Sequence, residues 1–133
     1  MSKANVTLVQ GLYAAFQRGD IAAIIAALTP DVAWHSHGRP EDYPTLGLRR
    51  GPQDVQKFFS TVAENQTATD FSPREYFTDN DKVIVRGHYA WILRKTAKAV
   101  SADWVHIFTV KDGKVTTFDE FTDTAQFAGA LRA

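Results

Sequence analysis

The sequence predicts an α+β fold in which N-terminal helices pack on a curved, mostly antiparallel sheet. In the first half of the chain apolar residues recur at helical spacing, whereas the second half alternates apolar and polar residues over long runs separated by turn residues. Helices that precede a run of strands, rather than alternate with them, are typical of the α+β class. Strands as long as those predicted here twist and curve, so sheet and helices together would enclose a cone-shaped cavity.

Three helices are expected before the long strands. The first has an apolar face whose members are four residues apart: Leu8, Leu12 and Phe16. Gly19 would end this helix, and Asp20 would cap a second helix at residues 21–28. Pro52 suits the first turn of a third helix. That helix carries a buried stripe at i, i+3, i+4 and i+7, formed by Val55, Phe58, Phe59 and Val62.

A short strand is expected at 32–36, and residues 38–51 are expected to form a loop because they hold three glycines and two prolines. Four longer strands follow, at 69–78, 82–94, 100–111 and 114–122. Asp112-Gly113 is a strong hairpin signal between the last two. Asp123, followed three residues later by Gln126, predicts a capping box that opens a final helix.

Composition limits the partners that this chain can take. Its 133 residues indicate one domain at 1–133, with 44% hydrophobic and 23% charged residues. Fifteen basic residues balance fifteen acidic ones, which speaks against nucleic acid or an anionic membrane as a partner. There is no cysteine, so disulfides and thiolate metal ligands are excluded. No apolar run approaches ~18 residues and the N-terminus lacks a signal-peptide pattern, so we expect a cytoplasmic protein.

Alternation along the strands assigns side chains to the cavity. On the third long strand His106 shares a face with Trp104 and Phe108, and on the last strand Glu120 shares a face with Phe118. We predict His106 and Glu120 as catalytic residues. The predicted ligand-binding residues are Tyr13, Trp34, His35, Ser36, His37, Phe59, Gly87, Tyr89, Trp91, Trp104, Phe108 and Phe118.

The opposite face of the third long strand is also largely apolar, with Val105 and Ile107 beside Asp103. An apolar outer sheet face is unusual for a monomer. It predicts either a homodimer formed through the sheet or a sheet covered on both sides by the protein's own helices.

The segment WHSHG places His35 and His37 on one face of the first strand. Two imidazoles at i and i+2 can share a metal ion, but a zinc site needs a third ligand, and no HExxH motif is present. We therefore expect no metal and no other cofactor. The two histidines would lie at the rim of the cavity, hydrogen-bonded to backbone or water, or would line it.

Four segments occur in the order of a known family: GDIAAIIAALTPDVAWHSHG, GLRRGPQDVQKFF, DWVHIFTVKDGKV and FDEFTDTA. With them the chain resembles the SnoaL-like, ketosteroid-isomerase-related branch of the nuclear-transport-factor-2-like superfamily. The resemblance implies a cone-shaped α+β barrel with a deep, mostly apolar pocket, commonly as a homodimer through the sheet. It leaves the activity open, because this fold hosts isomerases, cyclases, epoxide hydrolases and non-enzymatic binders.

The resemblance also implies where catalytic groups would lie. The related steroid isomerases use a tyrosine on the first helix, a carboxylate at the end of the first strand and a protonated acid on a late strand. In this chain those positions fall on Leu12 (beside Tyr13), on Ser36 and near His106. All three differ from the steroid isomerase pattern, which speaks against steroid isomerisation.

Two other activities of the fold remain as alternatives. Epoxide hydrolases use an aspartate–arginine–aspartate set around a water, to which Arg86 and Asp103 could contribute. Polyketide cyclases use a buried acid or base to remove a proton next to a carbonyl group. His106, with Glu120 or Asp103, could do this, because neutral imidazole is a suitable base near pH 7.

The sequence thus predicts a protein that binds a small apolar, carbonyl-bearing molecule in a deep pocket. As an enzyme it would be an isomerase or cyclase without cofactor, in which His106 and Glu120 transfer a proton while His35, His37 and Tyr89 orient the substrate. The alternative is a non-catalytic module for small-molecule binding or oligomerisation. An acid/base pair within hydrogen-bond reach inside the pocket would favour the enzyme.

Overall fold

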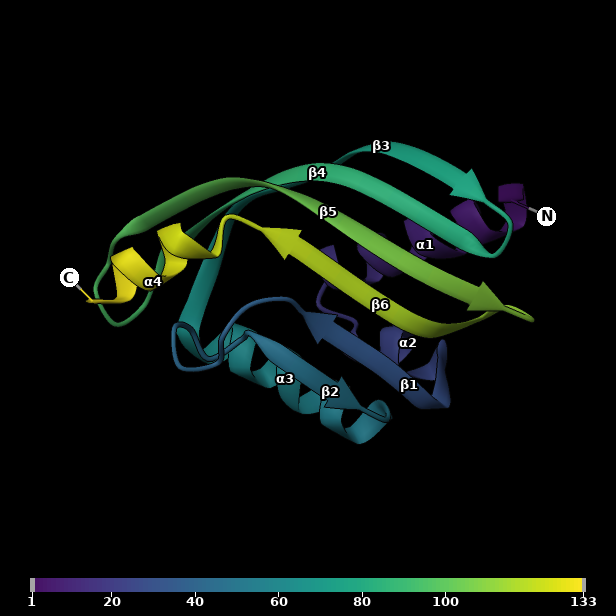
Figure 1. Cartoon of the computed structure of the whole chain (residues 1–133), viewed down its shortest axis with the longest axis horizontal. Helices are drawn as coiled ribbons and strands as arrows, with labels where there is room; N and C mark the ends of the chain where they lie inside the picture. The colour runs from purple at the N-terminus through teal and green to yellow at the C-terminus, as the bar shows by residue number, and fades with distance from the viewer. Residues whose placement is uncertain (1, 133) are drawn as a thin grey trace.

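The computed structural model describes residues 2–132 and shows helices packed against one curved six-stranded sheet (Figure 1). The elements are α1 (Ser2–Gln17), α2 (Ile21–Ala26), β1 (Leu28–Ser36), β2 (Gly47–Arg50), α3 (Pro52–Asn65), β3 (Gln66–Asp79), β4 (Lys82–Leu93), β5 (Ala99–Lys111), β6 (Lys114–Thr122) and α4 (Thr124–Arg132). The strand order is β2-β1-β6-β5-β4-β3, and only the β1–β6 pair is parallel. The predicted α+β class is confirmed, with a sheet whose edges β2 and β3 stay open.

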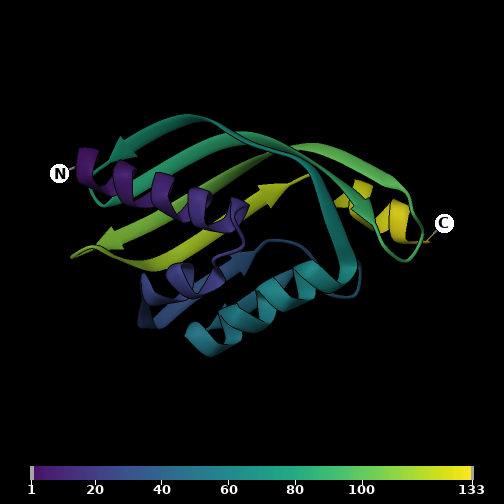
Figure 2. The same ribbon diagram turned by 180° about the vertical axis from the view of Figure 1, so that it is seen from behind.

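The first three helices cover the concave side of the sheet (Figure 2). Helix α1 packs on β3 and β4, whereas α3 packs on β1 and β2. The short α4 lies beside the N-terminal end of β5. Helices α1 and α3 therefore form one wall of the cone, and the curved strands form the other. Within residues 2–132 none of the helices is long and apolar enough to cross a membrane.

The helices begin where the sequence places their caps. The Asp20 carboxylate accepts a hydrogen bond from the Ala23 N–H at 3.2 Å, which satisfies one free donor of α2. Helix α2 is shorter than predicted because Leu28 already pairs with Val115 of β6. Pro52 opens α3 as expected, after Gly51 at a φ of 83°.

The strands differ from the prediction mainly at their ends. Residues 38–51, expected to be a loop, contain β2, a four-residue edge strand that pairs with β1. It was not predicted because it is short and flanked by glycines, so no alternation of apolar and polar residues marks it as a strand. Strand β3 begins at Gln66, earlier than predicted. Its Pro73 lies at a bulge on the open edge, where the missing N–H costs no ladder bond.

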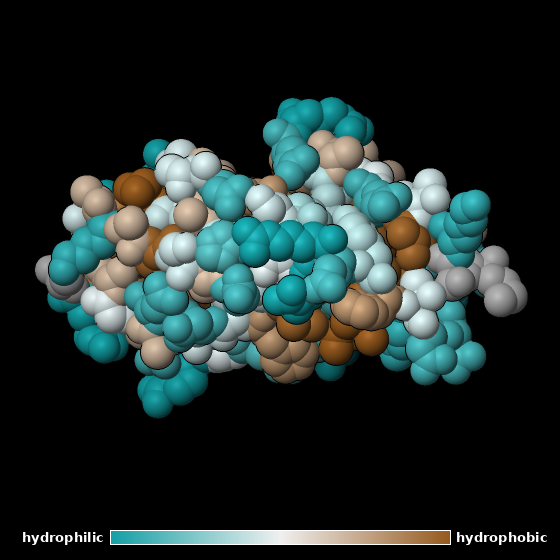
Figure 3. Space-filling model, turned by 90° about the horizontal axis from the view of Figure 1, so that it is seen from above, coloured by the Kyte–Doolittle hydropathy of each residue, from teal (hydrophilic) through white to brown (hydrophobic). Residues whose placement is uncertain are grey.

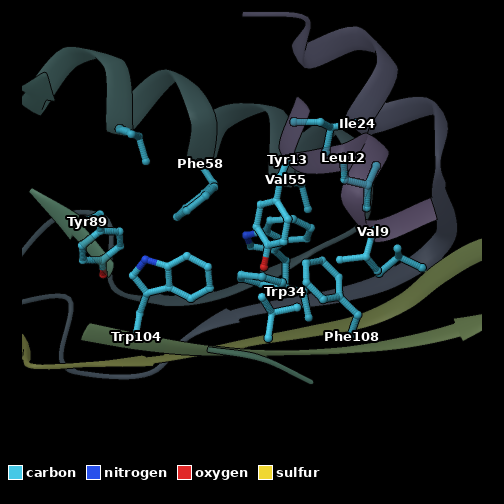
Figure 4. Packing of buried hydrophobic residues seen from close by; sticks show 14 of the residues in the cluster. Val9, Leu12, Tyr13, Ile24, Trp34, Val55, Phe58, Tyr89, Trp104 and Phe108 are labelled. Atoms are coloured by element: carbon cyan, nitrogen blue, oxygen red, sulfur yellow. The ribbon is translucent and has the colours of Figure 1, made fainter. Parts of the chain in front are cut away.

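The inward face of the sheet is the one that alternation predicts. On β5 Trp104, His106 and Phe108 are buried, and on β4 Tyr89 and Trp91 are buried. Tyr13 reaches from α1 toward the sheet between Trp104 and Phe108 (Figure 4). An aromatic core thus fills the space between α1 and the curved strands.

Gly87, predicted as a ligand-binding position, leaves no room for a ligand. The space beside it is occupied by the Trp104 indole, which lies directly over Gly87. A Cβ at this position would also be 2.7 Å from the Ser72 carbonyl oxygen. Glycine is therefore required here by packing.

Candidate functional site

A continuous chain of hydrogen bonds joins four elements at the centre of the cone. The Tyr13 hydroxyl of α1 lies 2.8 Å from His106 Nδ1 of β5. His106 Nε2 lies 2.8 Å from Glu120 Oε2 of β6, and the Tyr89 hydroxyl of β4 donates to the same oxygen at 3.4 Å. His106 is only 4% exposed. The two predicted catalytic residues are thus within hydrogen-bond reach of each other.

The position of the protons along this chain follows from the two phenols. Burial raises the pKa of Tyr13 well above its ordinary value, and Tyr76 and Glu120 raise it further. Burial and then Glu120 raise the pKa of Tyr89 in the same way. Both hydroxyls therefore stay protonated at neutral pH. The Tyr13 hydroxyl can then donate to Nδ1, an arrangement in which Nε2–H donates to the Glu120 carboxylate.

Aromatic neighbours fix the orientation of the His106 imidazole ring. The Trp104 indole stacks on His106 with 3.9 Å between ring centroids and 19° between planes. The Phe118 ring meets His106 edge-on at 4.8 Å. Because one ring packs on its face and another meets it edge-on, the imidazole keeps one orientation toward Glu120.

A cavity opens beside this chain of hydrogen bonds. Its volume is about 90 Å³, which is room for about three waters or a compact organic group. Of the predicted site residues, those that line it are Tyr13, Trp34, Phe59, Tyr89, Trp91, His106, Phe108, Phe118 and Glu120. The walls are mostly aromatic, and two of the polar side chains, those of His106 and Tyr89, meet at Glu120.

Four buried polar atoms have no partner among residues 2–132: the indole nitrogens of Trp34, Trp91 and Trp104 and the hydroxyl of Ser36. Leaving a buried donor without an acceptor costs about 1–3 kcal/mol. Trp34 and Trp91 belong to the cavity wall. Their indole nitrogens have almost no accessible surface, so these unpaired donors do not face the cavity.

His35 and His37, expected among the ligand-binding residues, do not line the cavity. Ser36 and Trp34 turn toward the core, and the two histidines lie on the opposite face of β1. The interpretation that they orient a substrate in the pocket is therefore not supported by their placement.

The outer face of the sheet also holds the groups required by the epoxide hydrolase alternative. Arg86 pairs with Glu75 there, and the Asp103 carboxylate lies 2.8 Å from His88 Nδ1. Asp103 is thus separated from His106 by the sheet. The aspartate–arginine set does not form in the cavity, and Glu120 is the carboxylate that reaches His106.

The two histidines of WHSHG meet a third polar side chain across the sheet. Their rings stack with 3.7 Å between centroids, and His37 Nε2 is 2.7 Å from Asp119 Oδ1 on β6. Partial burial lowers the pKa of His35, His37 lowers it further, and Asp119 opposes the shift. In the part of the chain that the structure describes, this is the group of side chains that can hold a metal ion.

Sequence reasoning missed part of the site. Thr122, which lines the cavity, could have been found because it shares the strand face of Glu120. Thr45 and Gln66 also line it, but both come from segments without a periodic pattern. The Tyr13–His106 bond joins residues 93 positions apart, and no local signal indicates it.

Solved structures similar to this chain share its fold over nearly their full length. An NTF2-like protein of unknown function from Burkholderia pseudomallei is 25% identical, with a TM-score of 0.87 and 98% of each chain covered. An NTF2-like protein from Burkholderia thailandensis is 28% identical, with a TM-score of 0.88, covering 97% of this chain and 98% of that one. TerC, co-crystallised with polyporic acid, is 26% identical, with a TM-score of 0.86, covering 98% of this chain and 99% of that one.

No protein with a curated description matches the chain. Residues 9–118 match the SnoaL-like domain, a span that runs from α1 to the middle of β6 and includes Tyr13 and His106. Together with the helix-on-curved-sheet architecture, this match shows that the chain belongs to the SnoaL-like domain family, within the NTF2-like fold.

Proposed function

We propose that this protein binds a small, largely apolar, carbonyl-bearing molecule in the cone and catalyses proton transfer on it, as an isomerase or cyclase without metal or organic cofactor. The observation that carries the proposal is the Tyr13–His106–Glu120 chain of hydrogen bonds, which ends in an aromatic cavity. A carboxylate in such a water-poor site can take a proton from carbon next to a carbonyl group and return it elsewhere.

The geometry supports different roles for the two predicted catalytic residues. Both ring nitrogens of His106 are engaged, one by Tyr13 and the other by Glu120. Glu120 Oε2 accepts two hydrogen bonds, and Oε1 has no partner in the described residues. Oε1 is therefore the atom that meets the substrate and takes its proton. His106 is a positioning residue that holds the carboxylate through the hydrogen bond between Nε2 and Oε2.

The lining of the cavity supports the choice of substrate class. Its walls are mostly aromatic, with the polar side chains of His106, Glu120 and Thr122 among them. A substrate with carbonyl or hydroxyl oxygens on an apolar ring system would match this lining. Polyporic acid, with which TerC was co-crystallised, is a suitable first probe because TerC covers almost the whole of this chain.

The test separates binding from chemistry. Quenching of tryptophan fluorescence by polyporic acid measures binding, since two of the three tryptophans line the cavity. Incubation of apolar cyclic ketones and 1,3-diketones in D₂O, followed by mass spectrometry, measures exchange of the proton next to the carbonyl. We expect Glu120→Gln to slow exchange by about 100-fold or more while binding changes little.

The matched control is Asp103→Asn, which removes a carboxylate that faces away from the cavity and should leave exchange unchanged. Exchange that is equally fast in Glu120→Gln would reject the role of Glu120. Binding without exchange in any probe would favour the second candidate, a non-catalytic binder. That candidate is supported by the fact that both nitrogens of His106 are already satisfied within the protein.

We also propose that two copies associate through the outer face of the sheet. Helices α1 to α3 lie on the other side, and Val105 and Ile107 remain only half-buried on this face. Figure 3 shows a mainly hydrophilic surface, with hydrophobic residues at its lower rim and smaller groups toward its two ends. Sedimentation velocity should give about twice 14.8 kDa, and Ile107→Glu should reduce this to one chain while Lys111→Glu does not.

A further inference from the structure

The outer face of β1 carries a group of side chains that the cavity does not use. His35 and His37 are two residues apart, and their rings are stacked with an angle of 28° between the planes. Asp119 lies directly opposite His35 on the parallel strand β6. One ligand atom from each of the three residues lies within 4.8 Å of the other two.

We propose that His35, His37 and Asp119 bind one divalent transition-metal ion of the zinc class. Imidazole nitrogen and carboxylate oxygen are ligands that such ions share. Calcium and magnesium prefer oxygen ligands alone, and the absence of cysteine removes the thiolates that soft ions prefer. The proposal is independent of the proposed function, because the ligands lie on the face of β1 opposite to Trp34 and Ser36.

A salt bridge alone does not account for the arrangement. Asp119 satisfies His37 at 2.7 Å, but the His35 side chain makes no hydrogen bond within residues 2–132. Its ring nevertheless stacks on the His37 ring. The stacking keeps the ring nitrogens of His35 close to a second imidazole and a carboxylate. A shared cation uses all three groups at once, since it replaces the proton between His37 and Asp119 and also engages His35.

The backbone holds the three ligands at nearly the required spacing. The His37 N–H donates to the Glu120 carbonyl at 3.0 Å, which ties β1 to β6 at the end of the ligand pair. Ligands of one tetrahedral zinc ion lie about 3.4 Å apart, as its bond lengths of ~2.1 Å require. The His37 Nε2–Asp119 Oδ1 distance of 2.7 Å is shorter than this value, and all three ligand atoms lie within 4.8 Å of one another, so the site would form by side-chain rotations of modest size.

Neighbouring groups leave the site open to solvent. The Phe121 ring stacks on His37 with 4.3 Å between centroids and holds that imidazole in place. The side chains of His37 and Asp119 are about one-third exposed, at 34% and 33%. Three protein ligands leave coordination positions for water, so the ion would enter and leave readily, unlike an ion in a closed four-ligand site.

The experiment uses tag-free, chelator-treated protein titrated with zinc chloride in a calorimeter, and cobalt(II) followed by its visible absorption. We expect one ion per chain, and we expect His35→Asn and Asp119→Asn each to weaken binding by about tenfold or more. The control is His88→Asn, which removes another outer-face histidine that hydrogen-bonds a carboxylate and should leave affinity unchanged.

A second measurement tests the same ligands in the wild-type protein. In NMR spectra, zinc should shift the imidazole signals of His35 and His37 and leave that of the buried His106 in place. Zinc binding that is unaffected by His35→Asn, or that shifts His88 instead, would overturn the proposal, as would no binding at millimolar zinc. Circular dichroism of each variant would verify that the sheet is intact.

Discussion

His106 of β5 faces Glu120 of β6 across the sheet, with 2.8 Å between Nε2 and Oε2. The pairing depends on an irregularity in the hairpin that joins the two strands. Lys111 pairs with Lys114 at the turn, but the register shifts by one residue at Thr109, which leaves Thr116 without a partner. With regular pairing His106 would face Asp119, and the cavity would have another carboxylate at its centre.

Replacing His106 should separate the rate of proton transfer from ligand binding. In His106→Asn the imidazole bridge from Tyr13 to Glu120 is lost, so the carboxylate is held less firmly. We expect deuterium exchange to slow by about tenfold or more, while the affinity for polyporic acid changes little. A parallel loss of both quantities would mean that His106 only maintains the shape of the pocket.

Removing the Tyr13 hydroxyl should destabilise the fold. Tyr13→Phe leaves His106 Nδ1 buried without a donor, at a cost of about 1–3 kcal/mol in the free energy of unfolding. Urea unfolding followed by fluorescence measures this. Tyr76→Phe is the control, because its hydroxyl is only partly buried and the variant should stay within about 0.5 kcal/mol of the wild type.

Adding a methyl group at Gly87 should be costly. In Gly87→Ala the new Cβ would collide with the Trp104 indole and the Ser72 carbonyl oxygen, so we expect a loss of about 1–3 kcal/mol. At Gly129 of α4 an added methyl group would meet nothing within 4 Å, and Gly129→Ala should raise stability by about 0.5–1 kcal/mol through helix propensity. Thermal unfolding of both variants tests the contrast, and equal stability would contradict it.

Alkaline pH should destabilise the protein through its tyrosines. Burial raises the pKa of Tyr13, Tyr76 and Tyr89, and it raises the pKa of Tyr43 to about 12. Above pH ~10 the unfolded chain loses phenol protons that the folded chain keeps, so this contribution to stability is complete below pH ~10 and falls as the pH rises toward 12.

The absorbance of tyrosinate at 295 nm checks this directly. The folded protein should show little tyrosinate at pH 10, whereas protein in urea should be about half ionised. Tyr43→Phe should lose less stability than the wild type between pH 9 and pH 11, because it removes one of the shifted groups. Tyrosinate at pH 10 in the folded protein would contradict the prediction.

The helices and the long strands could be predicted because their signals are local. The Asp20 cap, Pro52 at the start of α3 and the Asp112-Gly113 turn each act within a few residues. Asp112 and Gly113 both have positive φ angles, 52° and 75°, as the predicted tight hairpin requires. Strand β2 was not predicted because its four residues lie on an edge of the sheet and none of them is buried, so they carry too little pattern.

The Asp123–Gln126 capping box is only partly as predicted. The Gln126 side chain does contact the Asp123 carboxylate, at 3.1 Å, but it also bonds the Ser101 carbonyl oxygen of β5 at 2.8 Å. A local motif has thus become a contact between α4 and the sheet. The alternation of residues could not reveal this, because the partner is 25 positions away.

The sequence by itself determined the α+β class, the inward face of β5 and the choice of His106 and Glu120 as a candidate pair. It did so because helix caps, turns and alternating burial act over short distances along the chain. Only the tertiary structure decided which groups meet. The shift at Thr116 turns Glu120 inward and Asp119 outward, and the parallel pairing of β1 with β6 brings Asp119 to His35, because register depends on contacts between strands that no single strand encodes.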